Sequence, residues 1–111
     1  MGKCDPPKFE SAGGHFNPEG RKHGYYNQAG PHAGDLPNLH VPDTGRLTVE
    51  TLAREVTLSG DRAKGDLLAA VKSDLLAGNG TALVVHAGVD DYKTDPTGEA
   101  GGRIACGVIR R

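Results

Sequence analysis

The first 35 residues constrain this chain most, because they lack any sustained apolar period and yet carry histidines at regular intervals. Gly, Pro, Asn, Lys and His dominate this segment, as in GGHFNPEGRKHG (13–24), where two histidines are eight residues apart. Such a pattern favours neither an amphipathic helix nor a buried strand. Loops of this length are uncommon in compact domains and are usually functional or ordered by a ligand.

Four side chains in this segment are candidate metal ligands: His15, His23, His32 and Asp35. Three imidazoles and one carboxylate match the ligand types and the number of ligands of a tetrahedral zinc site. Gly and Pro between them let the backbone turn around an ion, and the bound ion would supply folding free energy that the loop lacks. The simpler alternative is a solvated loop with scattered histidines. We interpret the cluster as a zinc site.

The size and charge of the chain limit what it can do. At 111 residues it is expected to be one domain, 1–111. Thirteen basic residues against 14 acidic ones offer no argument for nucleic acid or an anionic membrane as partner. No run of 18 apolar residues predicts a membrane span, and this sequence shows no signal peptide pattern. A small anionic substrate, which needs only a local positive charge, remains compatible.

The remaining pattern indicates a loop-rich β protein, since 17 glycines and 7 prolines favour many turns. Short strands are predicted at 36–41 and 46–58, joined as a hairpin by the turn PDTG. The β-branched run TALVVHAG (81–88) predicts a buried strand, and RIACGVI (103–109) predicts the last strand. A long polar loop separates these two.

One segment has helical spacing instead. In KGDLLAAVKSDLLAGNG the residues Leu67, Leu68, Val71, Leu75 and Leu76 recur on one face. An aspartate can cap the start of this segment and a glycine can end it, so a short amphipathic helix is predicted over 64–78.

Several single residues leave two interpretations open. Cys4 and Cys106 can be free thiols, or one disulfide that closes a loop of about 100 residues and adds about 4–5 kcal/mol of stability. His86, at the end of an apolar strand, is by itself more typical of a hydrogen-bonded structural residue. Arg103, taken alone, is expected to be an exposed arginine at the start of a strand, and His40 is expected to be a surface residue.

Five stretches together resemble the copper/zinc superoxide dismutases in their bacterial form: GGHFNP, KHG, HAGDLPN, ALVVHAGVDDY and GEAGGRIACGVI. The resemblance runs from Cys4 to Ile109, with the motifs in the family's order. The most specific piece is Gly98 to Ile109, which departs from the family signature only at Glu99, where Asn is usual.

The resemblance implies an all-β fold, part of a Greek-key β-barrel or sandwich with long metal-binding loops. It implies dismutation of superoxide to dioxygen and hydrogen peroxide, with zinc and copper as cofactors. By position, the implied zinc ligands are His15, His23, His32 and Asp35; the copper ligands are His15, as the bridging imidazolate, and His86. Asp90 would tie the two metal sites together, Arg103 would guide superoxide, and Cys4 and Cys106 would form the structural disulfide.

The chain departs from the family in one important way. The family's other two copper ligands come from a His-x-His motif, and no His-x-His occurs in this sequence. The first half of the family barrel has no counterpart either, so 1–111 corresponds to the C-terminal part of the family domain. Dismutase activity of the chain alone is therefore expected to be weak or absent.

Three interpretations follow from this departure. The chain can be a truncated or mis-started dismutase, a zinc-binding structural or interaction module without activity, or half of a split enzyme. In the last case another chain completes the barrel; a homodimer is a further possible partnership. The disulfide and the resemblance imply a periplasmic or extracellular parent protein.

Overall fold

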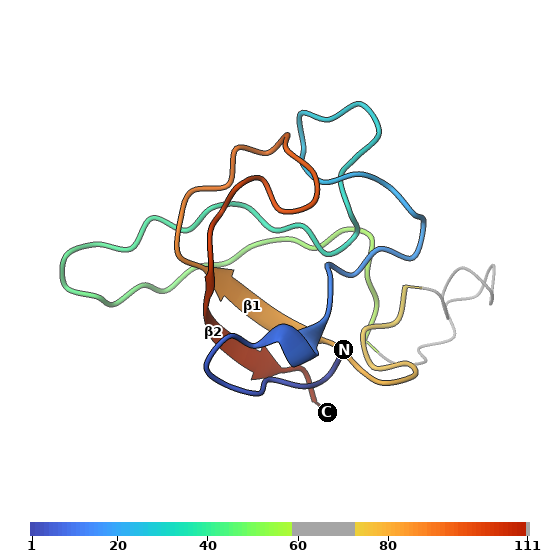
Figure 1. The fold of residues 1–111 in the computed structure, drawn as a ribbon, viewed down its shortest axis with the longest axis horizontal. Coiled ribbons are helices and arrows are strands. Elements are labelled where there is room, and N and C mark those ends of the chain that lie inside the picture. The colour runs from blue at the N-terminus through green and yellow to red at the C-terminus, as the bar shows by residue number, and fades with distance from the viewer. Residues whose placement is uncertain (59–72, 111) are drawn as a thin grey trace.

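The computed structural model describes residues 1–58 and 73–110, and these form few regular elements. They are a 3-10 helix, η1 (Glu10–Ala12), and two strands, β1 (Ala82–His86) and β2 (Arg103–Val108). Loops wrap around this small sheet on several sides (Figure 1). No helix in the described ranges is long and apolar enough to cross a membrane.

The strands β1 and β2 pair antiparallel, where strands were predicted at 81–88 and 103–109. Val84 pairs with Cys106 and Val85 with Ala105, and a bulge follows before His86 pairs with Arg103. A bulge re-aims the side chain next to it. The pairing therefore brings His86 and Arg103 together at one end of the sheet, where the loop between the strands begins.

The N-terminal segment is fastened to β2 at two places. Cys4 and Cys106 form a disulfide, with Cα atoms 5.6 Å apart, so the free-thiol alternative is wrong. The Arg103 guanidinium donates hydrogen bonds to the backbone oxygens of Phe9 (2.7 Å) and Gly13 (2.6 Å). Both ties place the segment just before His15 against the end of the sheet.

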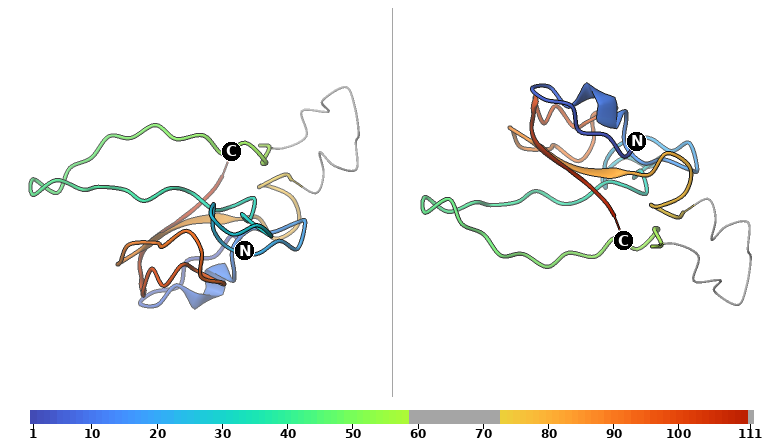
Figure 2. Two further views of the ribbon diagram at one scale, coloured as in Figure 1. Left: turned by 90° about the horizontal axis from the view of Figure 1, so that it is seen from above. Right: turned by 90° about the horizontal axis from the view of Figure 1, so that it is seen from below.

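The predicted strands at 36–41 and 46–58 are not formed. Their turn is present, since Gly45 N–H donates to Pro42 O at 2.8 Å, but no backbone hydrogen bond joins the two arms. The arms run out and back as a long loop that projects beyond the sheet (Figure 2). A hairpin without a third strand or a packed face is marginal in water. Here most of the large apolar side chains of the arms are exposed: Leu39, Val41, Leu47, Val49, Leu52 and Leu58.

The predicted helix over 64–78 is wrong for the part that can be judged. Residues 73–78 form turns, and Asp74 makes a parallel bridge to Thr57. Leu75 N–H donates to Thr57 O, which takes this stretch out of a helical hydrogen-bond pattern. Tertiary pairing has overridden local periodicity at this end. The rest of the segment, 64–72, lies outside the described residues.

The interior of the described chain is small and polar. Its buried apolar residues are the alanines Ala12, Ala33 and Ala100. The buried polar residues include His23, His32 and Asp35, and His23 is the largest side chain that is almost completely enclosed, at 1% exposure. Three alanines bury little apolar area, so the packed centre of the loops is the histidine and aspartate cluster rather than a hydrophobic core.

Candidate metal centre

The four residues singled out at the start of the chain converge in space. One ligand atom from each of His15, His23, His32 and Asp35 lies within 4.8 Å of the others. Oδ1 of Asp35 is 2.8 Å from His15 Nδ1 and 3.1 Å from Nδ1 of both His23 and His32. The Nδ1 atoms of His15 and His32 are 3.3 Å apart. The structure thus gathers the predicted ligand set at one point.

This geometry fits a zinc ion. Four ligands about 2.0–2.1 Å from a tetrahedral centre are about 3.3 Å from one another. The three separations from Asp35 Oδ1 and the one between His15 and His32, 2.8 to 3.3 Å, are close to that edge length, and all four ligand atoms lie within 4.8 Å of one another. Three imidazole nitrogens facing one carboxylate oxygen compete for the same acceptor, because an oxygen offers about two lone pairs. A cation at the centre would satisfy all four atoms at once.

Asp35 is prepared for this role by its surroundings. Burial by itself would raise the pKa of the Asp35 carboxyl. The hydrogen bond from His15 and those from the backbone N–H groups of Gly24 and His32 outweigh burial and hold its pKa well below the usual range. Both N–H groups donate to Oδ2 at 3.0 Å, and the Tyr25 hydroxyl donates to the backbone oxygen of Asp35. The carboxylate is therefore ionised and oriented.

The loop that carries the ligands is folded by turn chemistry. The Asn17 side chain makes two hydrogen bonds to the Arg21 backbone: it accepts from the Arg21 N–H at 2.9 Å and donates to the Arg21 carbonyl oxygen at 2.8 Å. Gly30 N–H donates to Asn27 O, and Gly34 N–H donates to Phe16 O. Asn side chains commonly hold turns through such bonds. These bonds bring the three histidine-bearing stretches side by side without helix or strand.

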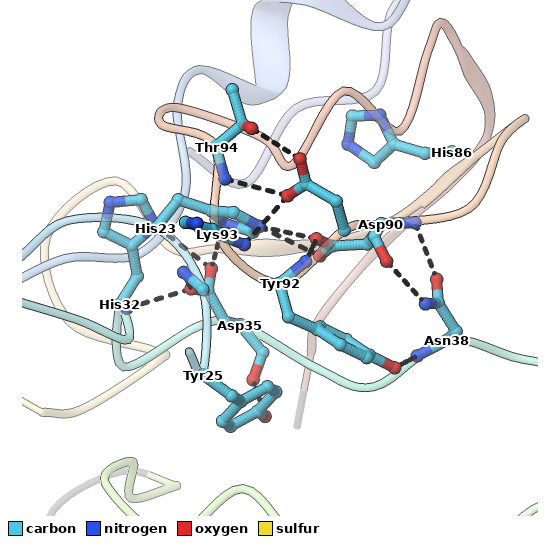
Figure 3. A network of polar contacts seen from close by, with 12 residues as sticks. His23, Tyr25, His32, Asp35, Asn38, His86, Asp90, Tyr92, Lys93 and Thr94 are labelled. Atoms are coloured by element: carbon cyan, nitrogen blue, oxygen red, sulfur yellow. Dashed lines mark hydrogen bonds and ion pairs between the residues drawn. The ribbon is translucent and has the colours of Figure 1, made fainter. Parts of the chain in front are cut away.

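A second carboxylate supports the cluster from the loop after β1. His23 Nε2 lies 2.9 Å from both carboxylate oxygens of Asp90. Figure 3 shows the two side chains facing each other. Burial lowers the pKa of His23, but the hydrogen bond to Asp90 and the charge of Asp35 more than compensate and raise it. Asn38 exchanges two hydrogen bonds with the Asp90 backbone, both at 2.9 Å, which fixes that loop.

The zinc-like cluster consists of His15, His23, His32 and Asp35. His86 lies apart from it (Figure 3). Its ring centroid is 6.1 Å from that of His15, and its Nδ1 lies 2.9 Å from Gly101 O. The contact with a carbonyl makes Nδ1 the protonated nitrogen and leaves Nε2 as the one that can bind a metal. His86 is thus hydrogen-bonded, as its strand position suggested, and is still able to act as a ligand.

An open cavity of about 430 Å³ lies beside His86. Arg103 lines it together with Lys8, Glu10 and Thr97. With two cationic side chains and one carboxylate around its wall, the cavity suits a small anion. His40, in contrast, is exposed and belongs to neither the cavity nor the cluster, as predicted.

Sequence reasoning missed several supporting residues. Asn38 and Tyr25 were not singled out, because an Asn and a Tyr in a loop carry no pattern by themselves. Asp95 was also overlooked in the polar stretch after β1, although its carboxylate accepts the His23 backbone N–H at 2.8 Å. Only the folded chain brings these residues, up to 72 positions apart, into contact.

Comparison with known proteins places these features in context. Residues 1–109 match the family model described as copper/zinc superoxide dismutase (SODC). The chain is 54% identical over 110 residues to the Cu-Zn superoxide dismutase 1 of Aquifex aeolicus (strain VF5), covering 99% of this chain and 60% of the relative. It is 44% identical to the superoxide dismutase-like protein YojM of Bacillus subtilis (strain 168), covering 97% of this chain and 50% of that protein.

A solved structure agrees with these matches. The crystal structure of a SOD-like protein from Bacillus subtilis superposes with a TM-score of 0.85 at 42% sequence identity, over 99% of this chain and 67% of that one. The chain therefore spans half to three-fifths of the length of the two curated relatives. Its described part shares their fold but forms an open, two-stranded sheet.

Proposed function

This chain belongs to the copper/zinc superoxide dismutase family, and from that membership we propose that it provides the zinc site and the anion-facing wall of a superoxide dismutase centre. The single observation that carries the proposal is the convergence of four ligand atoms within 4.8 Å. Family members use copper and zinc. Because the chain spans only part of its relatives, the dismutation of superoxide by this chain belongs to the proposal.

The zinc ion would be held by Nδ1 of His15, His23 and His32 and by Oδ1 of Asp35. The donor set of three imidazoles and one carboxylate is one that zinc binds in proteins. Asp90 would act through His23, keeping its proton on Nε2 so that Nδ1 faces the metal. Asp35, already ionised, needs no proton loss to bind.

His15 has the position to serve a second metal. With Nδ1 in the cluster, Nε2 would be the nitrogen that binds the second metal, and the ring centroid of His86 lies 6.1 Å from that of His15. Copper, when bound, supplies the one-electron chemistry that converts two superoxide ions and two protons to dioxygen and hydrogen peroxide. His15 can hold a proton at Nε2 and release it, which is the contribution of this chain to proton supply.

Arg103 would orient the anionic substrate. Its two hydrogen bonds to Phe9 O and Gly13 O fix the guanidinium at the cavity wall beside His86. A fixed positive charge in a recess raises the rate of association of a small anion by about 10- to 1,000-fold. Lys8 also lines this cavity and adds a second cation.

A second candidate function rests on the copper side. Among the described residues only His15 and His86 are placed to hold copper, and two imidazoles are fewer than a tight site needs. The alternative is therefore a zinc-dependent structural or interaction module without dismutase activity. In a third arrangement, another chain supplies the missing ligands and strands.

Metal analysis and activity together test the proposal. We expect the purified 111-residue chain to bind one zinc per chain, with His23→Ala reducing zinc content and His40→Ala leaving it unchanged. Superoxide consumption after copper loading would support the dismutase centre. Zinc binding with no activity in the isolated chain, and none after addition of a copurifying chain, would favour the zinc module. Absence of zinc binding would refute both.

The disulfide bears on where the protein works. A bond between Cys4 and Cys106 persists in oxidising compartments, so we propose that the protein acts in the periplasm or outside the cell. Within residues 1–58 and 73–110, each strand of the sheet pairs on one side, so its other edge would be available to a second copy or another chain. Light scattering of the purified protein would separate a monomer from a homodimer.

A further inference from the structure

Asp95 connects the loop after β1 to two of the three histidines of the zinc-like cluster. Its Oδ1 accepts a hydrogen bond from the backbone N–H of His23 at 2.8 Å. The same oxygen lies 3.9 Å from Nε2 of His32, an ion-pair distance that is longer than a hydrogen bond. Its other oxygen, Oδ2, accepts from Lys22 Nζ at 3.2 Å. The Asp95 side chain thus contacts Lys22, His23 and His32, three residues of the loop 16–35, which we call the ligand-bearing loop.

The two enclosed histidines of the cluster, His23 and His32, are arranged in the same way. Each turns Nδ1 toward Asp35, and each has a carboxylate on the side of Nε2: Asp90 for His23 and Asp95 for His32. A metal-bound histidine almost always gives its other N–H to a carboxylate, a carbonyl or water, and this partner fixes the ring and its tautomer. Asp95 occupies the position of such a partner for His32.

We propose that Asp95 is a positioning residue for the zinc ligands, orienting the His32 ring through Nε2 and holding His23 through its backbone. The inference rests on the proposed zinc site and adds a second supporting carboxylate beside Asp90. The contacts of Asp95 are separate from those of Asp90, because the two aspartates face different histidine rings and, of the two, Asp95 accepts the backbone N–H of His23.

The size of the effect follows from the geometry. The Asp95 side chain is 36% exposed, whereas that of His23 is 1% exposed, so water can replace part of what Asp95 provides. Loss of a supporting partner of a metal ligand typically lowers metal affinity by about 10- to 100-fold. Because the contact with His32 is long and partly exposed, we expect Asp95→Ala to lower zinc affinity by about tenfold, at the low end of that range.

Zinc affinity of the 111-residue chain, measured by competition with a chromogenic chelator, tests the inference. The matched control is Asp91→Ala, which removes a carboxylate from the same loop. Asp91 caps the turn at Lys93 and Thr94, accepting their N–H groups at 2.8 Å, and contacts no ligand of the cluster in the hydrogen bonds or ion pairs of the described chain. Asp95→Ala should weaken zinc binding about tenfold, and Asp91→Ala by less than twofold.

The visible absorption bands of bound cobalt provide a second measurement, which would not change if Asp95 only stabilised the loop without orienting the ligands. Co²⁺ in place of zinc has visible absorption bands that depend on ligand orientation, and these should shift in Asp95→Ala but not in Asp91→Ala. Asp95→Asn keeps an oxygen for the His23 N–H but lacks the charge facing His32. It should lose less affinity than the alanine variant, and it decides the matter if the alanine variant does not fold.

The outcomes separate this inference from the proposed function. Wild-type zinc binding with unchanged affinity and cobalt bands in the Asp95 variants overturns the role of Asp95 and leaves the zinc site standing. An equal loss in Asp91→Ala also overturns it, because the effect would then be general loosening of the loop. A wild-type chain that binds no zinc overturns the zinc site and this inference with it.

Discussion

His23 lies between two carboxylates, with Nε2 2.9 Å from both oxygens of Asp90 and Nδ1 3.1 Å from Oδ1 of Asp35. The ring is 1% exposed, so neither contact is exchanged readily for water. Asp90 belongs to the loop after β1 and Asp35 to the ligand-bearing loop. The buried imidazole therefore joins two loops that are far apart in the sequence.

Replacing Asp90 with asparagine should lower zinc affinity by about 10- to 100-fold, because the uncharged amide is a weaker acceptor for His23 Nε2–H than the carboxylate and fixes the tautomer of the ring less firmly. Chelator competition on the purified chain measures this. Asp91→Asn, one residue along and exposed, serves as the control and should change affinity little. Equal zinc affinity in Asp90→Asn and wild type would show that the negative charge of Asp90 does not support the zinc site.

Zinc should order the ligand-bearing loop, and His23→Ala should abolish that ordering. Zinc at 100 times its dissociation constant would stabilise the folded chain by about 2.7 kcal/mol, since it binds the folded state. Limited proteolysis of residues 16–35, with and without zinc, monitors the loop. His40→Ala is the matched control because His40 is exposed and outside the cluster. Identical zinc-dependent protection in both variants would contradict the prediction.

Removing the disulfide should cost much of the stability of the chain. The bond between Cys4 and Cys106 closes a loop with a sequence separation of 102 residues. A loop of about this length corresponds to about 4.7 kcal/mol in the chain-entropy model. The double variant Cys4→Ser, Cys106→Ser should therefore unfold at much lower urea, and wild type under reductant should behave alike. Unchanged urea midpoints in both samples would disprove the expected contribution.

Gly98→Ala should disturb the support of the cluster. Gly98 has φ of 62°, a region that costs other residues about 1–2 kcal/mol. A Cβ there would overlap the Asp90 carboxylate and lie 2.9 Å from Nε2 of His23. Lower thermal stability and weaker zinc binding are expected. Gly102→Ala is the control, since a Cβ at Gly102 meets nothing within 4 Å, and similar losses in both variants would argue against the steric explanation.

Some of the site was predictable from local pattern. The clustering of His15, His23, His32 and Asp35 was predictable from one Gly- and Pro-rich segment, because few residue types suit zinc and these four occur there together. The strands β1 and β2 were predictable because β-branched and apolar runs between turn residues indicate strands. The turn at 42–45 was predictable because the sequence PDTG has the residue types that favour a turn.

Other features were not predictable, because they depend on partners distant in the chain. The hairpin at 36–58 failed although its turn formed, since strand pairing needs a packed face that these arms lack. The 73–78 end of the predicted helix forms turns, because backbone contacts with Thr57 compete with the helical pattern. A short window of sequence shows neither the missing packed face of the hairpin nor the backbone contacts with Thr57.

By itself, the sequence determined the donor atoms, the two cysteines and the runs that become β1 and β2, because each depends on residue type or on neighbours in the chain. Only the tertiary structure decided that Cys4 meets Cys106, that His23 lies between Asp35 and Asp90, and that Asp95 faces His32. These contacts join segments up to 102 residues apart. Whether such segments meet depends on the free energy of the whole fold rather than on any local preference.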